Sequence, residues 1–156
     1  MLVVGCGCRG RGLAGALLAR GYAVRGTTRS ADRLAAIEAT GAEAAVADPD
    51  RLGTVMAQIA GVSAICWLLG SAHGDAVADL HGPRLETLLE RLVDTPVRGI
   101  VYESGGSVDA SLLAAGAQAV RSASDTWRMP VEIVEANPRG HDEWLEAMIA
   151  AVKRLL

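Results

Sequence analysis

The fold is decided near the start of the chain by residues 3–33, which read VVGCGCRGRGLAGALLARGYAVRGTTRSADR. An apolar run ends here in glycines, a helical stretch follows from about Gly10 to Arg20, and Tyr22 to Thr27 reads as a second strand. The glycines fit the pattern G-x-G-x-x-G with Gly5, Gly7 and Gly10. In such a unit the first glycine allows a tight turn, the second lets a phosphate approach the backbone, and the third lets helix and strand pack closely. The pattern therefore predicts a loop that holds a pyrophosphate, against the plainer interpretation of a glycine-rich turn that binds nothing.

The rest of the chain continues the alternation of strand and helix. Ser30 is placed to cap a helix that ends near Thr40, and Asp48 with Pro49 is placed to start another. Apolar side chains at helical spacing mark further helices near residues 85–92, 110–122 and 144–156. Strands are predicted over residues 2–4, 22–27, 42–47, 62–69, 98–103 and 131–135. Six strands alternating with helices predict a single α/β domain over residues 1–156, a Rossmann-like doubly wound parallel sheet with the order 3-2-1-4-5-6.

The composition excludes several classes of function. With 51% apolar and 21% charged residues, the chain is typical of a globular domain. A formal charge of −3 and an aromatic content of 3% give no basis for binding nucleic acid. The longest apolar run, residues 62–69, is too short to cross a membrane, and the N-terminus lacks the pattern of a secretion signal. Together with only three cysteines, these features predict a cytoplasmic protein.

A metal or redox site is one alternative for the glycine loop, because Cys6 and Cys8 lie within it. A structural zinc site needs four ligands, and the only other cysteine, Cys66, lies inside a predicted strand. We therefore expect these cysteines to be small fillers between the glycines, and we expect no metal. The possible ligands elsewhere, His73, Asp75 and His81, fit no metal-binding template.

A methyl-donor site is a second alternative, because V-x-G-C-G is similar to motif I of Rossmann-like methyltransferases. Those proteins have an acidic residue two positions before the first glycine and another at the end of the second strand. Here the first position holds Val3, and Gly26 to Ser30 contain no acidic residue. A dinucleotide is therefore the favoured ligand.

The end of the second strand indicates which dinucleotide. Units that bind NAD place an Asp or Glu there to accept hydrogen bonds from the ribose. This chain instead has Thr28, Arg29 and Ser30, followed by Arg33. Guanidinium groups suit a 2′-phosphate, and the hydroxyls add donors, so we predict NADP(H) in preference to NAD(H). Arg9 is a further candidate, for the adenine or its phosphate.

Residues 3–33 resemble the first βαβ unit of the atypical short-chain dehydrogenases, in particular the NmrA-like and flavin-reductase-like NAD(P)-binding proteins. The segments RGIVYESGG and WRMPVEIVEANP fall where that group has its fifth and sixth strands. The resemblance implies that the glycine loop holds the pyrophosphate and that Arg29 holds the 2′-phosphate.

The catalytic pair of ordinary short-chain dehydrogenases is missing from this sequence. That pair is Tyr-x-x-x-Lys, in which the tyrosine is the acid or base. Tyr22 and Tyr102 are each followed four residues later by a glycine, Gly26 and Gly106, and Lys153 is the only lysine. Any hydride transfer is therefore expected to depend on positioning of the cofactor.

The catalytic candidates follow the predicted fourth and fifth strands. Ser104 occupies the place where short-chain dehydrogenases carry a serine that bonds the substrate carbonyl, and His73 is the best available proton donor. Gly70 begins the loop beside the expected nicotinamide position and is a further cofactor-binding candidate. The connection from Gly70 to Gly82 is long, which is typical of a lid or binding loop.

Two functions remain open at this point. The favoured one is a small NADPH-dependent reductase that acts on a small-molecule substrate, and the alternative is a non-catalytic dinucleotide sensor or regulatory subunit. Only eighteen residues follow Pro138, which leaves little chain for a deep substrate pocket. A second subunit in a homo-oligomer would then close the site, although the apolar face of the last helix is expected to pack on its own sheet.

Overall fold

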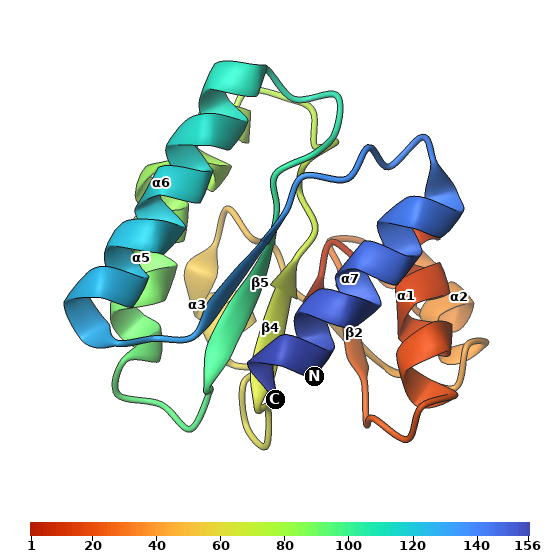
Figure 1. The fold of residues 1–156 in the computed structure, drawn as a ribbon. Helices are drawn as coiled ribbons and strands as arrows, with labels where there is room; N and C mark the ends of the chain where they lie inside the picture. Colours follow the sequence, from red (N-terminus) through yellow and green to blue (C-terminus); the bar gives the residue numbers. More distant parts are fainter.

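The computed structural model describes all residues from 1 to 156 and contains one six-stranded sheet (Figure 1). The strands are β1 (Leu2–Val4), β2 (Arg25–Thr28), β3 (Glu43–Val46), β4 (Ala64–Trp67), β5 (Gly99–Glu103) and β6 (Val131–Val134). Every neighbouring pair is parallel, and the order across the sheet is β3-β2-β1-β4-β5-β6. The predicted doubly wound α/β fold and its strand order are confirmed.

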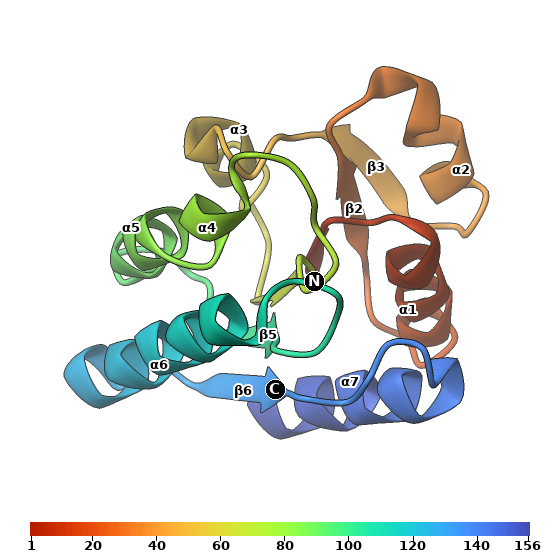
Figure 2. The same ribbon diagram turned by 90° about the horizontal axis from the view of Figure 1, so that it is seen from above.

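Helices cover both faces of this sheet, as the view from above shows (Figure 2). One face carries α1 (Cys8–Leu18), α2 (Leu34–Glu38) and α7 (His141–Leu155). The other face carries α3 (Leu52–Met56), α4 (Val77–Leu80), α5 (Pro83–Leu92) and α6 (Ala110–Trp127). None of these helices has the length and apolar character needed to cross a membrane.

The two cores follow from the alternation of side chains along each strand. Leu2 and Val4 enter the core under α3, α5 and α6, whereas Val3 between them enters the core under α1 and α7. Strands β4 and β5 are buried along their whole lengths, as their apolar runs require. On α7, Trp144 and Met148 are fully buried, so the apolar face of the last helix packs on its own sheet.

Two predicted helix starts are wrong. The side chain of Ser30 does not cap the helix, because its hydroxyl bonds to the Asp32 carboxylate and the chain first makes a short 3-10 turn, η1 (Ala31–Arg33). Asp48 and Pro49 do not begin α3, which starts at Leu52. The Asp48 carboxylate instead accepts the amide of Asp50, a local turn of the kind that competes with helix formation.

Other boundaries differ from the sequence predictions in ways that affect the site. Helix α1 begins at Cys8, two residues before the predicted start, so Cys8 and Arg9 lie in its first turn. The connection from Gly70 to Gly82 is not a continuous loop, because it contains α4. Strand β2 is shorter than predicted and begins at Arg25.

Candidate functional site

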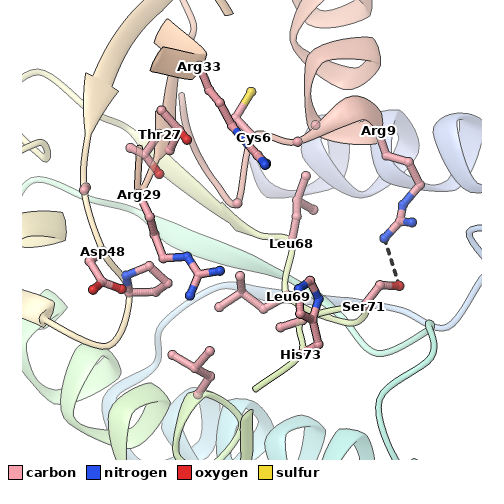
Figure 3. Close-up of a pocket in the computed structure, with 18 of the residues that line it drawn as sticks. Cys6, Arg9, Thr27, Arg29, Arg33, Asp48, Leu68, Leu69, Ser71 and His73 are labelled. Atoms are coloured by element: carbon pink, nitrogen blue, oxygen red, sulfur yellow. Dashed lines mark hydrogen bonds between the residues drawn. The ribbon is translucent and has the colours of Figure 1, made fainter. Parts of the chain in front are cut away.

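A cavity of about 370 Å³ opens at the edge of the sheet where the parallel strands end (Figure 3). Residues at the ends of β1, β2, β3 and β4 line it, together with the first turn of α1 and Trp144 of α7. Strand β1 lies between β2 and β4, and the chain leaves β1 and β4 toward opposite faces of the sheet. Open α/β sheets bind ligands where neighbouring connections diverge in this way.

The glycine loop forms one wall of the cavity, and its three motif glycines have different surroundings. Gly5 has a φ of +81°, and a Cβ there would lie 2.6 Å from the carbonyl oxygen of Leu68. At Gly10 a Cβ would lie 3.1 Å from the carbonyl oxygen of Gly5, which is tight helix–loop packing. At Gly7 a Cβ would meet no atom within 4 Å. The loop is therefore packed against β4 and leaves open space beside its second motif glycine.

The first turn of α1 faces this space. Gly7 is the N-cap of the helix and, having no side chain, provides no side-chain cap. The first amides of a helix lack partners within the helix and carry a partial positive charge. The amides of Cys8, Arg9 and Gly10 are therefore suited to an anion such as a phosphate.

Two arginines form the opposite end of the cavity, at the end of β2. The side chains of Arg29 and Arg33 both point into the cavity (Figure 3), and neither forms an ion pair. Thr28 lines the cavity beside them, and its hydroxyl accepts the amide of Ser30 at 3.3 Å. Ser30 itself is exposed and is not among the lining residues. This end of the cavity thus carries two free positive charges, with Asp48 on the β3 side.

Arg9 is held quite differently, although it also lines the cavity. Its Nη2 donates to the Ser71 hydroxyl at 3.1 Å and lies 3.6 Å from the Glu103 carboxylate. The guanidinium carbon lies 5.7 Å from the centre of the Trp144 ring, in a cation–π contact. Arg9 is therefore tied to Ser71 after β4, to Glu103 at the end of β5 and to α7.

Glu103, the last residue of β5, is a functional candidate that sequence reasoning missed. Its side chain is fully buried, and its carboxylate accepts the amide of Gly70 and the indole N–H of Trp144, both at 2.9 Å. Burial raises the pKa of Glu103, and the charge of Arg9 together with these hydrogen bonds opposes the rise. The sequence feature that could have identified Glu103 is a carboxylate at the end of an otherwise apolar strand, GIVYE.

A second polar pair lies buried on the other face of the sheet. The Leu69 carbonyl, 3.1 Å from Nε2 of His81, can only accept, so Nε2 carries the proton and Nδ1 accepts the Tyr102 hydroxyl at 2.7 Å. Burial lowers the pKa of His81, with the hydrogen bond to Leu69 opposing it, and burial raises the pKa of Tyr102. His81 thus joins the end of α4 to β4 and β5, which the sequence did not reveal.

The remaining predicted residues fall in different places. His73 is exposed and lines the cavity, so it can reach a ligand there. Ser104 lies in a separate hollow beside Arg121 and Glu135, away from His73. Gly70 is buried and is not among the lining residues, and a Cβ there would lie 2.1 Å from the carbonyl oxygen of Gly105.

The three cysteines are free and differ in accessibility. Cys6 packs against Gly26, whose added Cβ would lie 2.7 Å from the sulfur, and burial raises the pKa of its thiol to about 11. Burial raises the pKa of Cys66 to about 12. Cys8 is exposed at the cavity. Only Cys8 is therefore open to reagents in solution.

The sheet order and the position of the cavity define a Rossmann protein. No family model and no curated protein sequence matches the chain. Solved structures do match it, at sequence identities that establish the fold alone.

Three of these structures show what kind of protein shares the fold. Triphenylmethane reductase from Citrobacter sp., complexed with NADP(H), matches 86% of this chain with 19% identity and a TM-score of 0.65. UDP-glucuronic acid 4-epimerase from Bacillus cereus, in complex with NAD, matches 88% with 15% identity and a TM-score of 0.67. A protein described as an NAD-dependent epimerase/dehydratase, from Bacillus halodurans, matches 88% with 20% identity and a TM-score of 0.71.

This chain spans 48% of the reductase, 59% of the 4-epimerase and 69% of the Bacillus halodurans protein. The resemblance to the atypical short-chain dehydrogenase and NmrA-like group, predicted from residues 3–33, is confirmed at the level of the fold.

Proposed function

We propose that the protein binds NADP(H) in preference to NAD(H) and acts in the cytoplasm as a small reductase. The observation that carries this proposal is the pair Arg29 and Arg33, which aim two guanidinium groups without ion-pair partners into the cavity. A 2′-phosphate is the doubly charged acceptor that such groups suit, and β2 ends without the carboxylate that a ribose diol requires. The matches to structures complexed with NADP(H) and with NAD support a dinucleotide as the ligand.

The rest of the cavity offers groups for the other parts of the dinucleotide. The amides of Cys8, Arg9 and Gly10 would hold the pyrophosphate, and the open space beside Gly7 fits its approach. The bound nicotinamide would supply the hydride chemistry. Exposed His73, on the β4 side of the cavity, would donate a proton to the substrate.

A non-catalytic dinucleotide sensor is the second candidate. The observation that favours it is the position of Ser104, which lies in a separate hollow and leaves His73 without a second catalytic group. A sensor needs only the cofactor end of the cavity.

Calorimetric titration and turnover assays test both functions. We expect NADP⁺ to bind at least about tenfold more tightly than NAD⁺, because charge-assisted hydrogen bonds to the 2′-phosphate are the stronger kind. Equal affinities would remove the argument from the arginines. Oxidation of NADPH with a panel of quinones, flavins and aldehydes then separates the two candidates, since tight binding without turnover favours the sensor.

A further inference from the structure

The ion pair between Arg9 and Glu103 joins the first turn of α1, beside the glycine loop, to the buried end of β5. Arg9 is the second residue of α1 and lies within the glycine motif, just before Gly10, yet its guanidinium is directed onto Ser71 and Glu103. Figure 3 shows this side chain extending along the rim of the cavity toward Ser71. A long arginine side chain in the first turn can also reach an anion held by the neighbouring amides.

The two side chains of the pair differ in how completely their polar atoms are hydrogen-bonded. The Arg9 side chain is 33% exposed, and its buried Nε has no hydrogen-bond partner. The Glu103 side chain is 0% exposed and has two further donors, the Gly70 amide and the Trp144 indole. If the guanidinium left, Glu103 would keep both hydrogen bonds but would lose the only positive charge beside it. A buried carboxylate in that situation favours its protonated form.

Building on the proposed function, we propose that a phosphate bound at the glycine loop takes the Arg9 guanidinium from Glu103, and that Glu103 then binds one proton from solvent. The ligand thus gains a charge-assisted hydrogen bond, and no buried carboxylate remains without its counter-charge. Glu103 is a positioning residue in this scheme, because it competes with the ligand for Arg9 and does not touch the ligand.

The direction of the pH dependence follows from this exchange. Loss of Arg9 removes the largest opposing influence on the raised pKa of Glu103, so the pKa is higher in the bound state than in the free state. Binding therefore takes up a proton, and affinity falls as the pH rises through the bound-state pKa. Among the other titratable groups nearby, His141 of α7 stacks on Trp144 with ring centres 6.0 Å apart. Tyr102, the neighbour of Glu103 in β5, bonds to His81 on the opposite face.

The test is calorimetry on the intact protein with two probes, NADP⁺ and inorganic pyrophosphate. Each titration is run at about pH 6 and at about pH 8, in buffers of different ionisation enthalpy, so that the protons exchanged on binding are counted. The phosphates of both probes also titrate in this range, so their own proton exchange is subtracted, and we expect the remaining uptake to be larger at the lower pH than at the higher.

Variants separate exchange from a purely structural role. Glu103→Gln frees Arg9, so we expect pyrophosphate to bind about threefold to tenfold more tightly, without proton uptake. A carboxylate that merely supported the fold would give weaker binding on removal. Arg9→Gln should weaken binding about tenfold and abolish the uptake. His141→Asn should retain the proton uptake. Glu132→Gln, which breaks the distant ion pair with Arg154, is the matched control and should retain it as well.

The outcomes for this inference and for the proposed function are distinguishable. NADP⁺ binding without proton uptake, or unchanged affinity in Glu103→Gln, overturns the exchange and leaves the proposed function standing. Pyrophosphate binding with uptake, but no binding of NADP⁺, supports the exchange and removes the function. Binding of neither probe overturns both. If Glu103→Gln does not fold, the wild-type proton count and Arg9→Gln decide.

Discussion

The two ends of the cavity use the same residue type in opposite ways. At the end of β2, Arg29 and Arg33 are exposed and have no ion-pair partner. On the β4–β5 side, Arg9 is bound to Ser71 and Glu103 and lies over Trp144. A free guanidinium gives its full interaction to a ligand, whereas a bound one must first exchange partners. The β2 end is therefore expected to set affinity, and the β4–β5 side to make that affinity depend on pH.

The largest effect is expected on the β4–β5 side of the cavity, where Gly70→Ala should lower the stability of the fold. A Cβ at residue 70 would lie 2.1 Å from the Gly105 carbonyl oxygen and close to Glu103, so the backbone must shift. We expect the free energy of unfolding to fall by about 3 kcal/mol, measured by urea denaturation. Gly7→Ala is the control, because its Cβ would meet nothing within 4 Å. It should lose no more than about 1 kcal/mol, the cost of alanine at an N-cap, yet bind NADP⁺ less tightly, and equal stability of the two variants would contradict the packing argument.

The next largest effect is expected at the end of β2, where Arg29 and Arg33 lie. Replacing Arg29 and Arg33 together with Ala should weaken NADP⁺ binding about 100-fold, since each charge-assisted hydrogen bond contributes about 1.5 kcal/mol. The affinity for NAD⁺, which lacks the 2′-phosphate, should stay within about twofold of the wild type. Calorimetry with both dinucleotides measures this difference. Equal losses for the two ligands would mean that the arginines do not read the 2′-phosphate.

A smaller effect is expected from the buried His81. Its folded-state pKa lies below the ordinary 6.5, so the unfolded chain binds more protons as the pH falls through this range. The contribution of neutral His81 is present above pH 6.5 and is lost as the pH falls through the folded-state pKa. Urea unfolding at several pH values measures it. His81→Gln keeps an acceptor for Tyr102 and a donor for Leu69 but does not titrate, so its stability should change less over the same range; a parallel change would assign the effect to another group.

The smallest effect is expected at Cys8. Because its side chain is exposed and backbone amides are proposed to bind the phosphate, Cys8→Ser should change NADP⁺ affinity by less than about twofold. Alkylation followed by mass spectrometry should label Cys8 and leave buried Cys6 and Cys66 unmodified. A large loss of affinity in Cys8→Ser would instead favour a metal or redox role for the thiol in the glycine loop.

The sequence predicted the features that depend on local pattern. The G-x-G-x-x-G spacing and the apolar runs are properties of neighbouring residues, and they were enough for the strand order and for the cavity wall formed by Gly5, Gly7 and Gly10. The contacts of Arg9 with Glu103 could not be predicted, because the two lie on different elements and meet only through tertiary packing.

The predictions of two helix starts were wrong for a different physical reason. Ser30 and Asp48 have the side chains of helix caps, but each side chain found another hydrogen-bond partner within two residues. For Ser104 the position after β5 was right, but it lies in a hollow lined by α6 residues such as Leu113 and Ala117, and these neighbours are brought together only by tertiary packing.

Trp144 contributes a wall of the cavity from α7, which is separated from the glycine loop by most of the chain. Before α7 docks beside α1, the Glu103 carboxylate lacks its indole donor and Arg9 lacks the ring beneath it. The first βαβ unit can form early from local contacts, but the complete cavity depends on a contact between distant parts of the chain, which forms slowly. Ligand binding during synthesis would therefore report the docking of α7 rather than the folding of the glycine loop.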